Sequence, residues 1–157
     1  MSPDPQALAT LLEHATVLRD EALTAARQAE AQAERQLRQA EQLQAYRGEY
    51  EQRWQSQFRQ GGSIQIVQCY RDFMSRLEQA LLTQRRQAEQ AEASCHHARA
   101  ALLEAERRVA SVKKLIERRE AEARRVVDRR DQKASDEMAA RHARNLPSAF
   151  GLLGRAG

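Results

Sequence analysis

Residues 59–66 read Arg-Gln-Gly-Gly-Ser-Ile-Gln-Ile and separate two long stretches that favour helices. From Ser63 to Leu146 the chain has neither Gly nor Pro, and few folds other than a long helix leave so long a stretch without a breaker. Gly61 or Gly62 can take the left-handed conformation that ends a helix, and Ser63 can cap the next one. So short a connection between two long helices predicts an antiparallel hairpin.

The composition favours a rod over a compact globule. The chain has 157 residues, of which 41% are hydrophobic but only 4% are aromatic. Aromatic side chains usually supply large parts of a core, whereas here Ala and Leu carry most of the apolar content. Such a composition is typical of a long helix or coiled coil. We therefore predict an all-α fold, a long antiparallel two-helix coiled coil (α-hairpin) with the second helix longer than the first.

The expected organisation is a single coiled-coil domain. Asp4 is a candidate N-cap of the first helix, and Pro147 is expected to stop the second. The predicted segments are a helix at about 6–59, a turn at about 60–63, a helix at about 64–144 and a flexible tail at 145–157.

Apolar residues recur at steps of three and four along both predicted helices, as in a coiled-coil seam, and the predicted seam of the first helix begins with Leu8, Leu11 and Ala15. In the first helix the step from Ala33 to Leu37 interrupts the register, which predicts a stutter. In the second helix the spacing is regular from Leu81 to Ile116 and continues through Arg119.

The unequal helix lengths predict that residues 118–144 have no partner within the chain. At 1.5 Å per residue this end projects by about 40 Å. It carries nine basic and six acidic side chains and still contains apolar residues. We therefore expect it to dock onto something, and self-association is one way of doing so.

Several classes of protein are disfavoured. The chain has no apolar run of transmembrane length, and its first residues lack the basic region of a secretory signal. Two cysteines do not make a disulfide framework, which fits a reduced cytoplasmic setting. No phosphate-binding loop, nucleophile elbow or zinc-protease motif is present in the sequence. We therefore expect no enzyme activity, no catalytic residues, no cofactor and no direct membrane insertion.

Two clusters could suggest other chemistry. Cys95, His96 and His97 are adjacent, so on a helix they point about 100° apart and cannot converge on a metal ion. The arginines between Arg119 and Arg130 alternate with acidic residues and lack aromatic stacking partners, which disfavours nucleic-acid binding. We expect no metal site and no nucleic-acid partner.

The scarce aromatic residues gather near the turn. Antiparallel pairing about Gly61 and Gly62 places Tyr50 opposite Phe73 and Tyr46 opposite Leu77. Two interpretations stay open here. The residues pack the seam, or they form a contact surface on its open flank, for which Tyr is well suited.

These residues, taken in order, resemble the flagellar type III export protein FliJ family. The resemblance rests on the segment Leu-Ala-Thr-Leu-Leu-Glu at 8–13, the ladder Leu43, Tyr46 and Tyr50, the segment from Tyr70 to Ala80, and the ending from Asp131 to Arg141. It implies a cytoplasmic rod at the inner-membrane face of the flagellar export apparatus, required for flagellum assembly and motility. The implied partners are the hexameric export ATPase FliI, the export gate protein FlhA and export chaperones.

The resemblance also implies two sets of site residues. The export-gate-binding patch is expected at Gln39, Leu43, Tyr46, Tyr50, Phe73, Leu77, Ala80 and Gln84. An ATPase-end motif is expected at Asp131, Lys133, Asp136, Glu137 and Arg141. From this assignment we expect replacement of Phe73 or Leu77 by Ala to weaken gate binding while leaving helicity and ATPase binding intact.

Two alternatives belong to other classes of protein. The chain could be the equivalent stalk of a virulence type III secretion system, or a generic coiled-coil scaffold with no ATPase contact. Genomic neighbours and an ATPase assay, respectively, separate these alternatives from a flagellar stalk.

Overall fold

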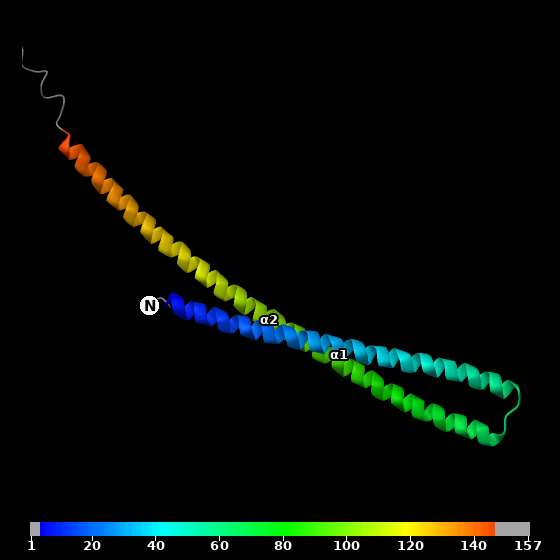
Figure 1. The fold of residues 1–157 in the computed structure, drawn as a ribbon. Coiled ribbons are helices and arrows are strands. Elements are labelled where there is room, and N and C mark those ends of the chain that lie inside the picture. Colours follow the sequence, from blue (N-terminus) through cyan, green and yellow to red (C-terminus); the bar gives the residue numbers. More distant parts are fainter. Residues whose placement is uncertain (1–3, 147–157) are drawn as a thin grey trace, which may run out of the picture.

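The structure is a computed structural model, and it describes residues 4–146. Helix α1 spans Pro5–Arg59 and helix α2 spans Ile64–Asn145 (Figure 1). The two helices pack against each other as a hairpin, and the second is the longer. The predicted fold class is therefore confirmed. Asn145 belongs to α2 rather than to the expected tail, and residues 147–157 of that tail lie outside the described residues.

The helix ends follow from the local sequence. Asp4 caps α1, since its Oδ1 accepts a hydrogen bond from the backbone N–H of Gln6 at 3.4 Å, and Pro5 starts the helix. At the turn Gly61 has a φ of +100°, a conformation that favours glycine. Ser63 is the N-cap of α2, but its side chain makes no capping hydrogen bond. Its backbone carbonyl instead accepts from the backbone N–H groups of Ile66 and Val67.

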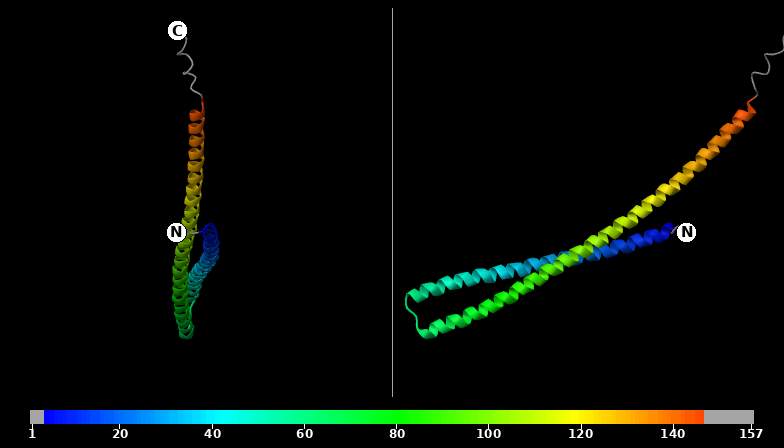
Figure 2. Two further views of the ribbon diagram at one scale, coloured as in Figure 1. Left: turned by 90° about the vertical axis from the view of Figure 1, so that its left-hand side faces the viewer. Right: turned by 180° about the vertical axis from the view of Figure 1, so that it is seen from behind.

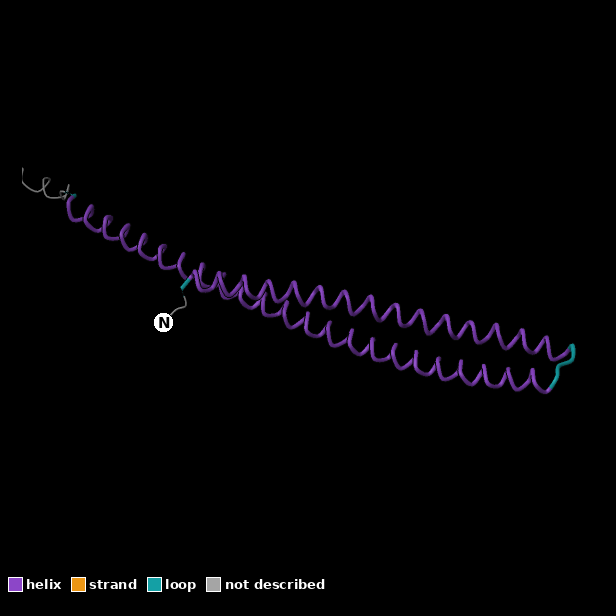
Figure 3. The backbone as a smooth tube through the Cα atoms, turned by 60° about the horizontal axis from the view of Figure 1, so that its bottom comes forward, coloured by secondary structure: helices purple, strands orange, loops and turns teal. Residues whose placement is uncertain are grey.

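A narrow seam between α1 and α2 holds the hairpin together. Figures 2 and 3 show α1 and α2 lying side by side from the turn to the start of α1. Among residues 4–146, the buried side chains lie in this seam, and they are Leu8, Ala15, Ala26, Met74, Leu77, Leu81, Cys95 and Val109. Small and medium apolar residues at steps of three and four thus replace the core of a globular domain.

The seam of α1 differs from the predicted one. Leu37 is 55% exposed and Leu11 is 47% exposed, while the neighbouring Gln36 and Leu12 are half-buried. The positions facing α2 keep steps of four and three through Ala33, Gln36 and Ala40. The predicted stutter is therefore wrong. In this part of α1 the polar Gln36 occupies the seam position, and the apolar Leu37 lies on the surface.

The seam of α2 agrees with its prediction. Every predicted position from Leu81 to Arg119 is buried or half-buried. Ala123 and Val126, which continue the pattern, are exposed because they lie beyond the N-terminal end of α1.

The C-terminal part of α2 extends beyond the start of α1 (Figure 1). All side chains from Glu122 to Leu146 are exposed. We call residues 122–145 the overhang, which is about 36 Å long at 1.5 Å per residue. It begins four residues later than predicted because Arg119 and Ala121 are half-buried. Within residues 4–146, neither helix is long and apolar enough to cross a membrane.

Candidate docking surfaces of the rod

The predicted gate-binding patch is assembled from both helices near the turn. The Tyr46 and Tyr50 rings of α1 have centroids 5.2 Å apart, and Tyr50 packs on Phe73 of α2 at 4.4 Å. The stack crosses the seam because antiparallel pairing places Tyr50 opposite Phe73, as the sequence predicted. The aromatic residues therefore pack the seam and also reach its flank.

The eight patch residues differ in what they offer to a partner. Gln39, Tyr46 and Ala80 are exposed, and Tyr46 keeps 44% of its surface accessible. The half-buried members are Leu43, Tyr50, Phe73 and Gln84. Leu77 is only 7% exposed and belongs to the seam. Because its side chain fills the space between the helices, truncation of Leu77 should destabilise the rod as well as alter the patch.

Gln84 forms a polar layer at one end of the patch. Its Nε2 donates to Oε1 of Gln36 at 2.7 Å, to the backbone carbonyl of Gln36 at 3.2 Å and to Oε1 of Gln39 at 3.2 Å. A polar residue in a coiled-coil seam costs stability but favours one register. Gln84 therefore helps to keep the two halves of the patch aligned.

A second aromatic cluster lies closer to the turn. Trp54 and Phe58 of α1 contact Tyr70 of α2, with centroid distances of 5.1 and 5.4 Å. The nearby Ile64 and Ile66 are 79% and 37% exposed. The contacts of this cluster are therefore mainly between aromatic rings.

The predicted ATPase-end motif lies entirely on the overhang. All five side chains are exposed, and α1 does not reach this part of α2. Lys133, Glu137 and Arg141 are spaced four residues apart and so share one face of the helix. The motif therefore has no role in holding the described hairpin together.

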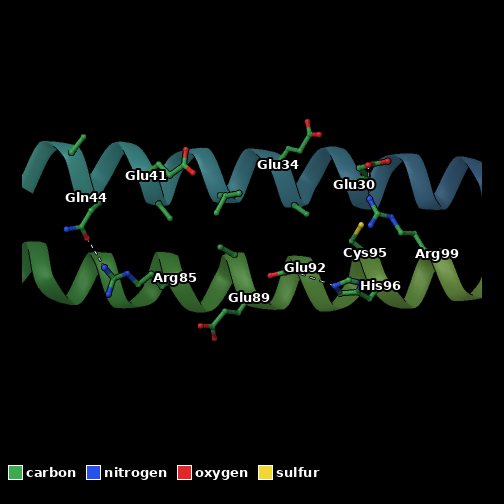
Figure 4. A pocket seen from close by; sticks show the side chains of 15 residues that line it. Glu30, Glu34, Glu41, Gln44, Arg85, Glu89, Glu92, Cys95, His96 and Arg99 are labelled. Atoms are coloured by element: carbon green, nitrogen blue, oxygen red, sulfur yellow. Dashed lines mark hydrogen bonds and ion pairs between the residues drawn. The ribbon is translucent and has the colours of Figure 1, made fainter.

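A groove on one flank of the rod was not predicted. It has a volume of about 800 Å³ and runs between α1 and α2 halfway along the hairpin (Figure 4). We call it the acidic groove. Its floor includes Ala33, Leu37, Ala40, Ala45 and Ala88. Its rim carries five glutamates, namely Glu30, Glu34, Glu41, Glu89 and Glu92.

The two basic rim residues of the groove already have partners. Arg99 pairs with Glu30 at 2.8 Å, and Arg85 donates to Oε1 of Gln44 at 2.7 Å (Figure 4). Both side chains cross the seam and tie α2 to α1. Glu41 and Glu89 have no ion-pair partner within residues 4–146. The rim is therefore net acidic.

The groove and the predicted patch lie on opposite flanks of the seam. On α1, Leu37 and Gln44 fall on one side of the seam residue Ala40, at about +60° and +40°. Gln39 and Leu43 fall on the other side, at about −100° and −60°. None of the eight patch residues lines the groove. A partner on one flank therefore leaves the other flank accessible.

The Cys95 and His96 side chains reach the groove without forming a metal site. Cys95 is buried at 5% exposure, whereas His96 is exposed and lies 3.7 Å from Glu92. Among residues 4–146, no group of three or more His, Cys, Asp or Glu side chains is arranged to hold a metal ion.

Comparison with known proteins identifies the family. The family model described as the flagellar FliJ protein matches residues 5–147, which is most of the chain. Searches of curated proteins and of solved structures gave no match. The family match confirms the resemblance found in the sequence. A match over both helices and the turn between them shows that this chain belongs to the flagellar FliJ protein family.

Proposed function

We propose that this chain is the non-catalytic central stalk of the flagellar protein export apparatus. Its overhang enters the ring of the export ATPase FliI, and the patch near the turn contacts the export gate protein FlhA. The family match supports a role in flagellar export in general. The partner assignments rest on the predicted site residues and on their positions along the rod.

The shape of the overhang supports this proposal most directly. It is one helix wide, fully exposed, and extends beyond the two-helix part of the rod. A single helix can enter a narrow central opening that a wider domain cannot. The five motif residues are all free to contact a surrounding ring because none of them is used inside the hairpin.

The patch supports the contact with the gate in a similar way. Tyr46 is exposed at its centre, and Tyr50 and Phe73 hold its position from the seam side. Aromatic residues with an exposed polar tip are favoured at protein interfaces. A partner bound near the turn stays well separated from one bound at the overhang, so the rod can link ATPase and gate.

Three further parts of the proposal concern the setting. The rod works in the cytoplasm at the face of the inner membrane, escorts export chaperones and carries no catalytic group. The family match supports the flagellar setting, and the elongated shape leaves long exposed surfaces for chaperones.

The proposal is tested with the full-length chain and a purified hexameric export ATPase. We expect the chain to bind the ring and to raise its rate of ATP hydrolysis. Replacing both Lys133 and Arg141 by Ala should weaken binding at least about tenfold, which corresponds to about 1.4 kcal/mol. Helicity should stay unchanged, because both residues are exposed and Ala favours helices.

Arg86→Ala provides the matched control. Arg86 is an exposed arginine of α2 that lies outside the motif and outside the groove. This variant should bind and stimulate the ATPase like the unmodified chain. A chain that neither binds nor stimulates the ATPase would contradict the stalk proposal, and a Lys133/Arg141 variant with full affinity would contradict the placement of the motif.

A further inference from the structure

We propose that the acidic groove binds the overhang of a second copy of this chain, so that two rods form an antiparallel dimer. An open groove between two paired helices is the surface that a third helix covers in a three-helix bundle. The groove floor is mostly alanine, which lets a third helix approach closely. The Leu37 side chain projects from this floor and is 55% exposed, so more than half of its surface is accessible to a third helix.

The overhang has an apolar stripe that fits such a floor. At 100° per residue, five of its apolar residues fall within an arc of about 120° on one side of the helix, whereas Ala139, Ala140 and Ala143 lie outside this arc. Val126, Val127 and Met138 are 47%, 54% and 71% exposed. The stripe consists of Ala123, Val126, Val127, Ala134 and Met138. A helix with such a stripe is expected to bury it against another surface.

Charge makes the overhang a suitable occupant of this groove. Helical geometry places four basic side chains within or beside the stripe. The four are Arg130, Lys133, Arg141 and Arg144. Two acidic side chains, Asp131 and Glu137, lie on the same face, so this face is net basic. The groove rim offers Glu41 and Glu89 without ion-pair partners of their own within the described chain. The basic face and the acidic rim are therefore complementary.

The positions along the rod allow both contacts to form at once. Measured along α2, the groove lies about 35–55 Å from the turn, and the overhang lies about 90–120 Å from it. When two rods lie antiparallel, the overhang of each can reach the groove of the other. The arrangement closes with two copies, because the same pair of surfaces is used on both sides of the symmetry axis.

The dimer has a consequence that rests on the proposed function. It covers the same overhang that would enter the ATPase ring, so dimer formation and ring binding compete. The patch lies on the opposite flank of the seam and stays accessible in the dimer. In the absence of the ATPase, the second copy would then cover the ATPase-binding end of each chain until the ring displaces it.

The dimer is tested by sedimentation velocity on the full-length chain alone, over a range of micromolar concentrations. We expect a concentration-dependent dimer that weakens at high salt, since its rim contacts are ionic. Glu41→Lys with Glu89→Lys should weaken the dimer at least tenfold, as should Arg130→Glu with Lys133→Glu. Combining the two pairs should restore it, because each new lysine then meets a new glutamate.

Glu13→Lys with Glu49→Lys is the matched control for charge. Both glutamates are exposed and lie two residues from the seam positions Ala15 and Arg47, which places them on the side of α1 away from α2. This variant should dimerise like the unmodified chain, and circular dichroism should show equal helicity for all variants. A monomer at every concentration would overturn the proposal, as would a dimer that the groove and overhang pairs leave unchanged. No ATPase is present, so these outcomes are independent of the stalk proposal.

Discussion

Single residues decide whether the seam of this rod is apolar or polar. Gln36 and Arg47 occupy seam positions of α1 that are ordinarily apolar. Each is matched by a polar residue of α2, since Gln84 donates to Gln36 and Glu78 pairs with Arg47 at 2.8 Å. Arg47 also approaches Glu51 at 3.8 Å. Polar groups are tolerated in a seam when partners satisfy them, and α2 supplies a partner to each of these two residues, although the buried Nε of Arg47 has no hydrogen-bond partner within residues 4–146.

Tyr46 and Leu77 allow docking to be separated from folding. Tyr46→Ala removes an exposed ring and should lower the free energy of unfolding by about 1 kcal/mol or less. Leu77→Ala leaves a hole in the seam and should lower it by about 2–5 kcal/mol. We therefore expect Tyr46→Ala to lose gate binding while its thermal unfolding stays nearly unchanged. Leu77→Ala should lower the unfolding temperature clearly.

Pull-down with the gate protein and thermal unfolding followed by circular dichroism measure these two properties. Leu82→Ala is a useful control for loss of apolar surface, because Leu82 is 52% exposed and lies outside the patch. If Tyr46→Ala retained full affinity for the gate, the predicted patch would be in the wrong place.

The turn and the interior of α1 place opposite demands on glycine. Gly61 has a φ of +100°, so a side chain there is strained even though nothing lies within 4 Å of an added Cβ. Gly48 lies inside α1, where an added Cβ also meets nothing within 4 Å. The same substitution should therefore have opposite effects at the two positions.

Gly48→Ala should raise the free energy of unfolding by about 0.5–1 kcal/mol, because Ala favours the helix more than Gly does. Gly61→Ala should lower it by about 1–2 kcal/mol, because L-residues disfavour positive φ. Urea denaturation of both variants measures the difference. A stabilising effect of Gly61→Ala would show that the turn can adopt another conformation without cost.

At the scale of the whole molecule, stability is distributed unevenly along α2. Residues 64–121 pack against α1 for most of their length, whereas every side chain of the overhang is exposed within the described part of the chain, residues 4–146. Helices without tertiary contacts open easily, since their stability depends on propensity alone. The end that the proposed function assigns to the ATPase is thus the least protected part of the rod.

Amide hydrogen exchange should reveal this difference. In dilute solution we expect amides of the overhang to exchange at least about tenfold faster than those around Leu81–Val109. Raising the protein concentration should slow exchange in the overhang and along the acidic groove together, if the proposed dimer forms. Equal protection along the whole of α2 in dilute solution would contradict the uneven distribution of stability.

The sequence alone determined the elements and their order. Helix propensity, the long stretch without Gly or Pro and the pair Gly61-Gly62 are local properties, so they predicted two unequal helices and the turn between them. The spacing within α2 also predicted its seam through Arg119, because nearly every seam position there is apolar. The family resemblance rested on the same printed residues and agrees with the family match.

Only the tertiary structure decided which side of α1 faces α2. Leu37 suggested a stutter because an apolar residue is expected in the seam when one helix is considered alone. In the paired helices, the seam position belongs instead to Gln36, which meets Gln84 of α2. That choice leaves Leu37 exposed and makes it part of the groove floor. It also buries Leu77 and exposes Tyr46. Burial and grooves depend on which residues of two distant segments meet, and spacing along one helix does not contain that information.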